Sequence, residues 1–107
     1  MSALSDRLEK MLAAGQDTAL LRFSLGNAYL NENPDQAAVH LAVAVTLDPA
    51  YSAAWKILGK ALALNDDTAA SIGAYERGIE VATRNGDKQA AKEMSVFLKR
   101  LKQAPKP

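Results

Sequence analysis

The chain contains no cysteine, one histidine and few aromatic residues, and each scarcity narrows what the protein can do. Without cysteine it has no disulfide, no thiol nucleophile and no thiolate ligand for a metal. A single histidine offers no His-x-x-x-His pair, and neither a Gly-x-Ser-x-Gly motif nor a phosphate-binding glycine loop occurs. These absences argue against an enzyme, and they predict no metal and no cofactor.

Long apolar runs and a strong net charge are also missing. No stretch approaches about 18 consecutive apolar residues, and the first residues lack the apolar segment of a signal peptide, so we expect a cytoplasmic protein. The 107 residues carry a net charge of +1, which argues against a general affinity for polyelectrolytes. The charge is uneven, because seven basic and two acidic residues from Arg84 onward leave +5 there and −4 on residues 1–83.

Apolar residues recur at helical spacing along the whole chain, and no run alternates as a strand would. The expected helices cover residues 3–14, 17–30, 34–47, 51–64, 68–83 and 87–102. Four polar residues are expected to cap helix starts: Asp17, Asn33, Asp67 and Asp87. We expect one domain over residues 1–103 and a disordered tail over 104–107.

One pattern of large and small side chains occurs twice. Its first half reads Trp55-x2-Leu58-Gly59-x2-Leu62 and matches, 33 positions earlier, Arg22-x2-Leu25-Gly26-x2-Tyr29. Its second half reads Ser71-x3-Tyr75-x2-Gly78 and matches, 34 positions earlier, Ala37-x3-Leu41-x2-Ala44. A period of this length indicates a solenoid of helical hairpins, whose units cannot bury their apolar faces alone.

These residues resemble the tetratricopeptide repeat, whose pattern is Trp-x2-Leu-Gly-x2-Tyr, then Ala-x3-Phe, a small residue and Pro. The resemblance implies an all-α, right-handed solenoid of antiparallel helix pairs with about six helices. A half-repeat helix (3–14) would precede two full repeats (17–50 and 51–84) and a capping helix (87–102). Glycines would stand where helices cross closely, and Trp55 and Tyr75 would fill the adjacent gaps. Arg22 replaces the usual aromatic residue.

The resemblance also implies a function, namely an adaptor that binds a peptide or helix of a partner protein in a concave groove. The first helix of each repeat would line that groove. Its lining residues would be Leu20, Phe23, Asn27, Leu30, Ala53, Lys56, Lys60, Ala63, Gln89, Lys92, Val96 and Lys99. The lysines favour an acidic segment or a C-terminal carboxylate, with Phe23 as an apolar anchor. Asn27 matches one position of the family's carboxylate clamp, but Phe23, Ile57, Gln89 and Glu93 stand where its other polar residues would be.

Other interpretations stay open. The groove lysines could simply keep a helix face soluble, and the unpartnered side of helix 3–14 could form a homodimer. The basic cluster Lys99, Arg100 and Lys102 could contact nucleic acid, although Phe97 is expected to pack on the preceding helix instead. His40 is expected to be an ordinary surface histidine.

Overall fold

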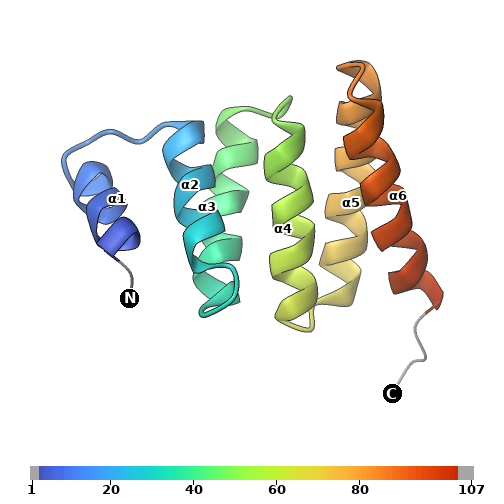
Figure 1. Cartoon of the computed structure of the whole chain (residues 1–107), viewed down its shortest axis with the longest axis horizontal. Coiled ribbons are helices and arrows are strands. Elements are labelled where there is room, and N and C mark those ends of the chain that lie inside the picture. The colour runs from blue at the N-terminus through green and yellow to red at the C-terminus, as the bar shows by residue number, and fades with distance from the viewer. Residues whose placement is uncertain (1–2, 104–107) are drawn as a thin grey trace.

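The computed structural model describes residues 3–103, and in this range it contains six α-helices and no strand. They are α1 (Ala3–Ala13), α2 (Ala19–Tyr29), α3 (Pro34–Leu47), α4 (Ser52–Leu64), α5 (Thr68–Arg84) and α6 (Lys88–Gln103). Figure 1 shows them side by side in chain order, each running opposite to the one before. The expected all-α solenoid of antiparallel helix pairs is confirmed. The tail expected over 104–107 lies outside the described residues.

The helices form two layers, and the layers are not equally tight. In Figure 1, α2, α4 and α6 lie on the nearer side, with α3 and α5 behind them. Helix α4 packs against both α2 and α6, whereas within residues 3–103 the backbones of α3 and α5 do not approach each other. Closer spacing on one side curves the stack toward that side, so α2, α4 and α6 form the concave face.

Each hairpin closes on a glycine that faces a large side chain. A Cβ placed on Gly59 would lie 2.6 Å from the Tyr75 ring, and one placed on Gly26 would overlap Leu41. Leu41 and Tyr75 are themselves equivalent positions of the two repeats. The duplicated sequence pattern therefore corresponds to a duplicated contact, in which the missing side chain of one helix makes room for the other.

Trp55 and Phe97 occupy inter-helix positions, as the sequence predicts. The Cβ of Trp55 lies against Gly78 on α5, and its indole nitrogen donates a hydrogen bond to the carbonyl oxygen of Pro49 (2.9 Å). The ring of Phe97 lies on that of Tyr75, with the centroids 5.7 Å apart. Both aromatic rings are therefore tied to the packing between helices.

Three of the four expected helix caps are present, and one prediction was wrong. The side chains of Asn33, Asp67 and Asp87 each accept a hydrogen bond from the backbone three residues further on. At α2 the cap is Thr18 instead of Asp17, because Thr18 is the residue three before the Leu21 amide that it accepts (3.1 Å). The Asp17 carboxylate instead binds the guanidinium of Arg22 (2.7 and 2.9 Å).

His40 is buried, so the prediction of an ordinary surface histidine was wrong. Only 6% of the residue is exposed. Its Nδ1 lies 3.0 Å from Arg22 Nη1, its Nε2 lies 3.9 Å from Glu9 on α1, and its ring stacks on Tyr29. The replacement of an aromatic residue by Arg22 could not be linked to His40 from sequence, because the two positions lie on different helices, 18 residues apart.

Candidate binding groove

The predicted groove residues lie on α2, α4 and α6, the three helices of the concave face, except Leu30, which directly follows α2 as its C-cap. On α2, Leu20 is 65% exposed, Asn27 is exposed and Phe23 is half-buried, as is Leu30. On α4, the side chains Ala53, Lys56, Lys60 and Ala63 are half-buried. On α6, the exposed residues are Gln89, Lys92, Val96 and Lys99. A partner approaching this face could therefore reach side chains from three helices.

Lys56 differs from the other groove lysines because it is already paired. Its ammonium lies 3.5 Å from the carboxylate of Glu93 on α6. The pair joins two neighbouring helices of the concave face and offsets the charge of Lys56. Within residues 3–103, by contrast, no acidic side chain pairs with Lys60, Lys92 or Lys99. The positive charge of the groove therefore lies mainly with these three lysines.

Lys60 is held in the groove by an aromatic ring. Its ammonium lies 5.3 Å from the centroid of Phe97, which in turn lies on Tyr75. A cation over an aromatic face is attracted by the negative face of the ring. The contact fixes one positive charge above the junction of α4 and α6 without neutralising it.

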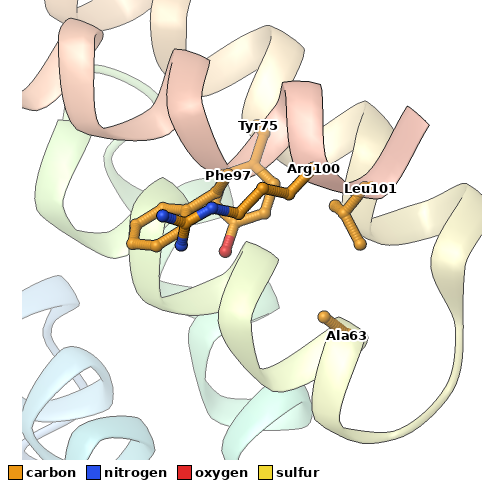
Figure 2. Close-up of a pocket in the computed structure, with 5 residues that line it drawn as sticks. All are labelled: Ala63, Tyr75, Phe97, Arg100 and Leu101. Carbon is orange, nitrogen blue, oxygen red and sulfur yellow. The ribbon is translucent and has the colours of Figure 1, made fainter. Parts of the chain in front are cut away.

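Two adjoining hollows open where α2, α4 and α6 approach their C-terminal ends. One measures about 320 Å³ and is lined by Leu30, Asn31, Lys60, Ala63, Leu64 and Tyr75. The other measures about 210 Å³ and is lined by Ala63, Tyr75, Phe97, Arg100 and Leu101 (Figure 2). Because they share Ala63 and Tyr75, the two hollows are parts of one depression, here called the α4–α6 hollow.

Tyr75 forms the floor of this hollow. The residue is 2% exposed and lines both parts, and no hydrogen bond joins its hydroxyl to another residue of the described range 3–103, so the hydroxyl is left to the space of the hollow. Burial raises the pKa of Tyr75 to about 12, so the hydroxyl keeps its proton at neutral pH. The hollow therefore presents an unused hydrogen-bond donor at its base.

Sequence reasoning missed several residues of the hollow, although a usable signal was present. Asn31, Leu64 and Arg100 immediately follow the predicted groove residues Leu30, Ala63 and Lys99 in the chain. They occupy the same position of successive repeats, so the repeat register could have added all three. Tyr75 could not be found in this way, because its role as a core residue gives no hint that its hydroxyl faces a cavity.

The other end of the groove is apolar. Phe23 lies against Tyr51, with ring centroids 5.0 Å apart. Next to it, a separate hollow of about 190 Å³ lies between α1 and α2 and includes Leu20 and Met11. Phe23 thus lies at the apolar end of the groove, whereas most of the positive charge of the groove lies toward α6.

The basic residues near the C-terminus contact different parts of the protein. Lys102 lies 3.5 Å from Glu76 on α5, Arg100 lines the hollow, and Phe97 packs inward on Tyr75. No aromatic side chain in the described part of α6 is therefore left to stack on a base between these cations.

Comparison with known proteins identifies the family. No protein-family model matches the chain. However, it is 53% identical over 98 residues to a TPR repeat-containing protein of Pseudomonas aeruginosa, covering 91% of this chain and 93% of that protein. The chain belongs to the tetratricopeptide-repeat family. The sequence-based resemblance is thereby confirmed.

Two solved structures resemble the tetratricopeptide fold of this chain. A solution structure of a Bordetella parapertussis protein matches with a TM-score of 0.82 and 48% identity, over 96% of this chain and 90% of the other. The crystal structure of the Sgt2 TPR domain from Aspergillus fumigatus matches with a TM-score of 0.73 over 96% of this chain and 71% of the other. At 23% identity, the second match bears on the fold alone.

Tetratricopeptide-repeat proteins generally mediate protein–protein interactions and are generally non-enzymatic scaffolds. Within residues 3–103, no group of three or more histidine, aspartate or glutamate side chains could hold a metal ion. Over the same range, no helix has both the length and the apolar character needed to cross a membrane.

Proposed function

We propose that this tetratricopeptide protein is an adaptor that binds an acidic segment of a partner protein along its concave face. The observation that carries the proposal is that the α4–α6 hollow lies on the same face as cations that pair with no acidic side chain of residues 3–103. Lys60, Lys92 and Lys99 lie on the concave face together with an apolar end around Phe23. Such a surface offers both apolar contact and attraction for carboxylates. We further propose that the adaptor acts in the cytoplasm.

A selection of random peptides displayed on phage tests this proposal. Peptides are selected on the wild-type protein and then compared on a variant with Lys60→Glu, Lys92→Glu and Lys99→Glu. A matched control carries Lys10→Glu, Arg77→Glu and Arg84→Glu, which make the same charge change on α1 and α5. Circular dichroism checks that both variants remain helical.

The proposal predicts that the selected peptides are acidic, lose binding to the groove variant and keep it on the control. Their binding should also weaken as salt rises, since the attraction is screened. Peptides without acidic residues, or equal binding to both variants, would contradict the proposal.

A second candidate function, a homodimer through α1, is favoured by one specific observation. Leu4 is 53% exposed on α1, and Met11 is 37% exposed on the same helix. Sedimentation over a concentration series would compare the wild type with Leu4→Ser and with Val39→Ser, an equally exposed valine on α3. Dimerisation that only Leu4→Ser weakens would support this candidate, and a monomer at every concentration would exclude it.

A further inference from the structure

The α4–α6 hollow combines apolar walls with positively charged and hydrogen-bonding residues, and this combination limits what can bind in it. Its walls are apolar, built from Ala63, Leu64, Leu101 and the rings of Phe97 and Tyr75. The polar residues in its lining are Lys60, Arg100, Asn31 and Tyr75, which carry an ammonium, a guanidinium, an amide and a hydroxyl. No acidic residue lines either part. An occupant must therefore bring an apolar body together with hydrogen-bond acceptors.

The open shape of the hollow, and not its size, favours a side chain over a free small molecule. Pockets for small-molecule ligands typically measure about 300–1,000 Å³ and enclose most of the ligand. The two parts of the hollow, of about 320 and 210 Å³, reach that size together, but both open onto the concave face and would leave a small ligand largely uncovered. A single large side chain of a segment lying in the groove suits such an open depression.

The local field favours an anion. Lys60 and Arg100 contribute two full positive charges and make no ion pair within residues 3–103. The C-terminal ends of α2, α4 and α6 oppose them with about half a negative charge each, and that effect fades within one helical turn. The two cations therefore outweigh the helix ends at the mouth of the hollow.

We propose that the α4–α6 hollow is a specificity pocket for a large apolar side chain flanked by carboxylates in a partner protein. The apolar side chain lies against Ala63, Phe97 and Leu101. A neighbouring carboxylate lies between Lys60 and Arg100 and accepts a hydrogen bond from the Tyr75 hydroxyl. This inference rests on the proposed function, because it names the part of the groove that reads the partner's sequence.

The probe for this pocket is a fluorescein-labelled peptide in which one leucine is flanked on each side by two glutamates. Two matched peptides replace the leucine by serine or the glutamates by glutamine. Fluorescence anisotropy gives the dissociation constant of each peptide. We expect the wild-type protein to bind the parent peptide at least about tenfold more tightly than either matched peptide, since each lacks one of the two required features.

Three single substitutions test the pocket from the protein side. Ala63→Leu fills the hollow and should weaken binding by at least about tenfold, whereas Ala42→Leu, on an exposed site of α3, should not. Arg100→Gln should weaken binding about three- to tenfold, and Lys102→Gln, with the same charge change outside the hollow, should have little effect. Tyr75→Phe should weaken binding about threefold while leaving thermal unfolding unchanged, because the hydroxyl has no partner within residues 3–103.

Each contrary result has a distinct meaning. Equal binding of the leucine and serine peptides, equal effects of Arg100→Gln and Lys102→Gln, or no effect of Ala63→Leu would each overturn the pocket. If the triple groove variant still abolishes binding in those cases, the proposed function stands while the pocket falls. Failure of the parent peptide to bind the wild-type protein also overturns the pocket, and the phage selection then decides the proposed function separately.

Discussion

At the C-terminal end of the solenoid, α6 buries Met94 completely and lays Phe97 on Tyr75. At the N-terminal end, α1 buries Leu8 and reaches His40 through a polar contact instead. Within residues 3–103, the backbone of α1 approaches only that of α2, whereas α6 packs against both α4 and α5. The two end helices are thus attached to different extents. Apolar packing against two helices fixes α6, which carries part of the proposed site, while α1 packs on one helix through Leu8 and Leu12 and adds the polar contact of Glu9 with His40.

The largest expected effect comes from loosening the C-terminal end. Met94→Ala removes a fully buried side chain that lies against Gly78, and it should lower the free energy of unfolding by about 3 kcal/mol. Urea denaturation measures the loss. Val96→Ala on the exposed side of the same helix is the control and should change the free energy by less than about 0.5 kcal/mol. Equal losses in both variants would show that α6 is not fixed by its buried face.

Truncating a buried side chain of α1 to alanine should destabilise a smaller part of the protein. Leu8→Ala should lower the free energy of opening α1 by about 2 kcal/mol, while the stability of α4 and α5 changes by less than about 0.5 kcal/mol. Native-state hydrogen exchange resolved by residue distinguishes the two quantities. If amides in α4 and α5 exchange faster by the same factor as those in α1, the solenoid opens as one unit, and α1 is not attached more weakly than α6.

The attachment of α1 should also depend on pH through His40. Burial lowers the pKa of His40 and the nearby positive charge of Arg22 lowers it further, while Glu9 and Asp17 oppose the shift. The folded protein therefore binds fewer protons than the unfolded chain between the lowered pKa and the usual histidine pKa of 6.5. The stability contributed by neutral His40 is complete above pH 6.5 and is lost as the pH falls toward the lowered pKa.

Hydrogen exchange of α1 between about pH 5 and 8 measures this dependence, after correction for the intrinsic pH dependence of exchange. His40→Gln keeps a side chain that can accept from Arg22 and donate to Glu9 but does not titrate, so it should flatten the profile. A second loss at lower pH is expected in both proteins, because the hydrogen bonds from Arg22 lower the pKa of Asp17 below 3.8. An equally steep profile in the variant above pH 5 would contradict the role of His40.

The smallest expected effect is at the surface of α6. The ammonium of Lys102 and the carboxylate of Glu76 are both more than half exposed, so their pairing is weak. Lys102→Gln should change the free energy of unfolding by less than about 0.5 kcal/mol. A loss comparable with that of Met94→Ala, measured by the same urea titration, would show that charge pairing also fixes α6.

The contacts explain which features could be predicted from sequence. The duplicated glycines and large residues directly encode the crossings at Gly26 and Gly59, so the helix pairs and the concave face followed from the repeat. Polar pairings between side chains of different helices were harder to predict from the sequence, because several side chains could pair with the same polar group. Lys56 with Glu93 and Arg22 with His40 are of this kind.

The candidate site, like the fold, could be predicted from the sequence only in part. The three groove helices and the exposed lysines on them followed from the repeat register. The hollow did not, because its depth depends on the small side chain of Ala63 facing the ring of Tyr75 across two helices. A cavity forms where neighbouring side chains leave space unfilled, and a sequence pattern does not show how the side chains of different helices fill the space between them.

The most direct test of the proposed site is a titration of ¹⁵N-labelled protein with the leucine-centred glutamate peptide, followed by amide NMR shifts. If the pocket binds this peptide, shifts will concentrate at Lys60, Ala63, Tyr75 and Arg100, with little change along α1 and α3. Shifts that concentrate on α1 or α3, or that spread evenly over all basic residues, would contradict a binding pocket between α4 and α6.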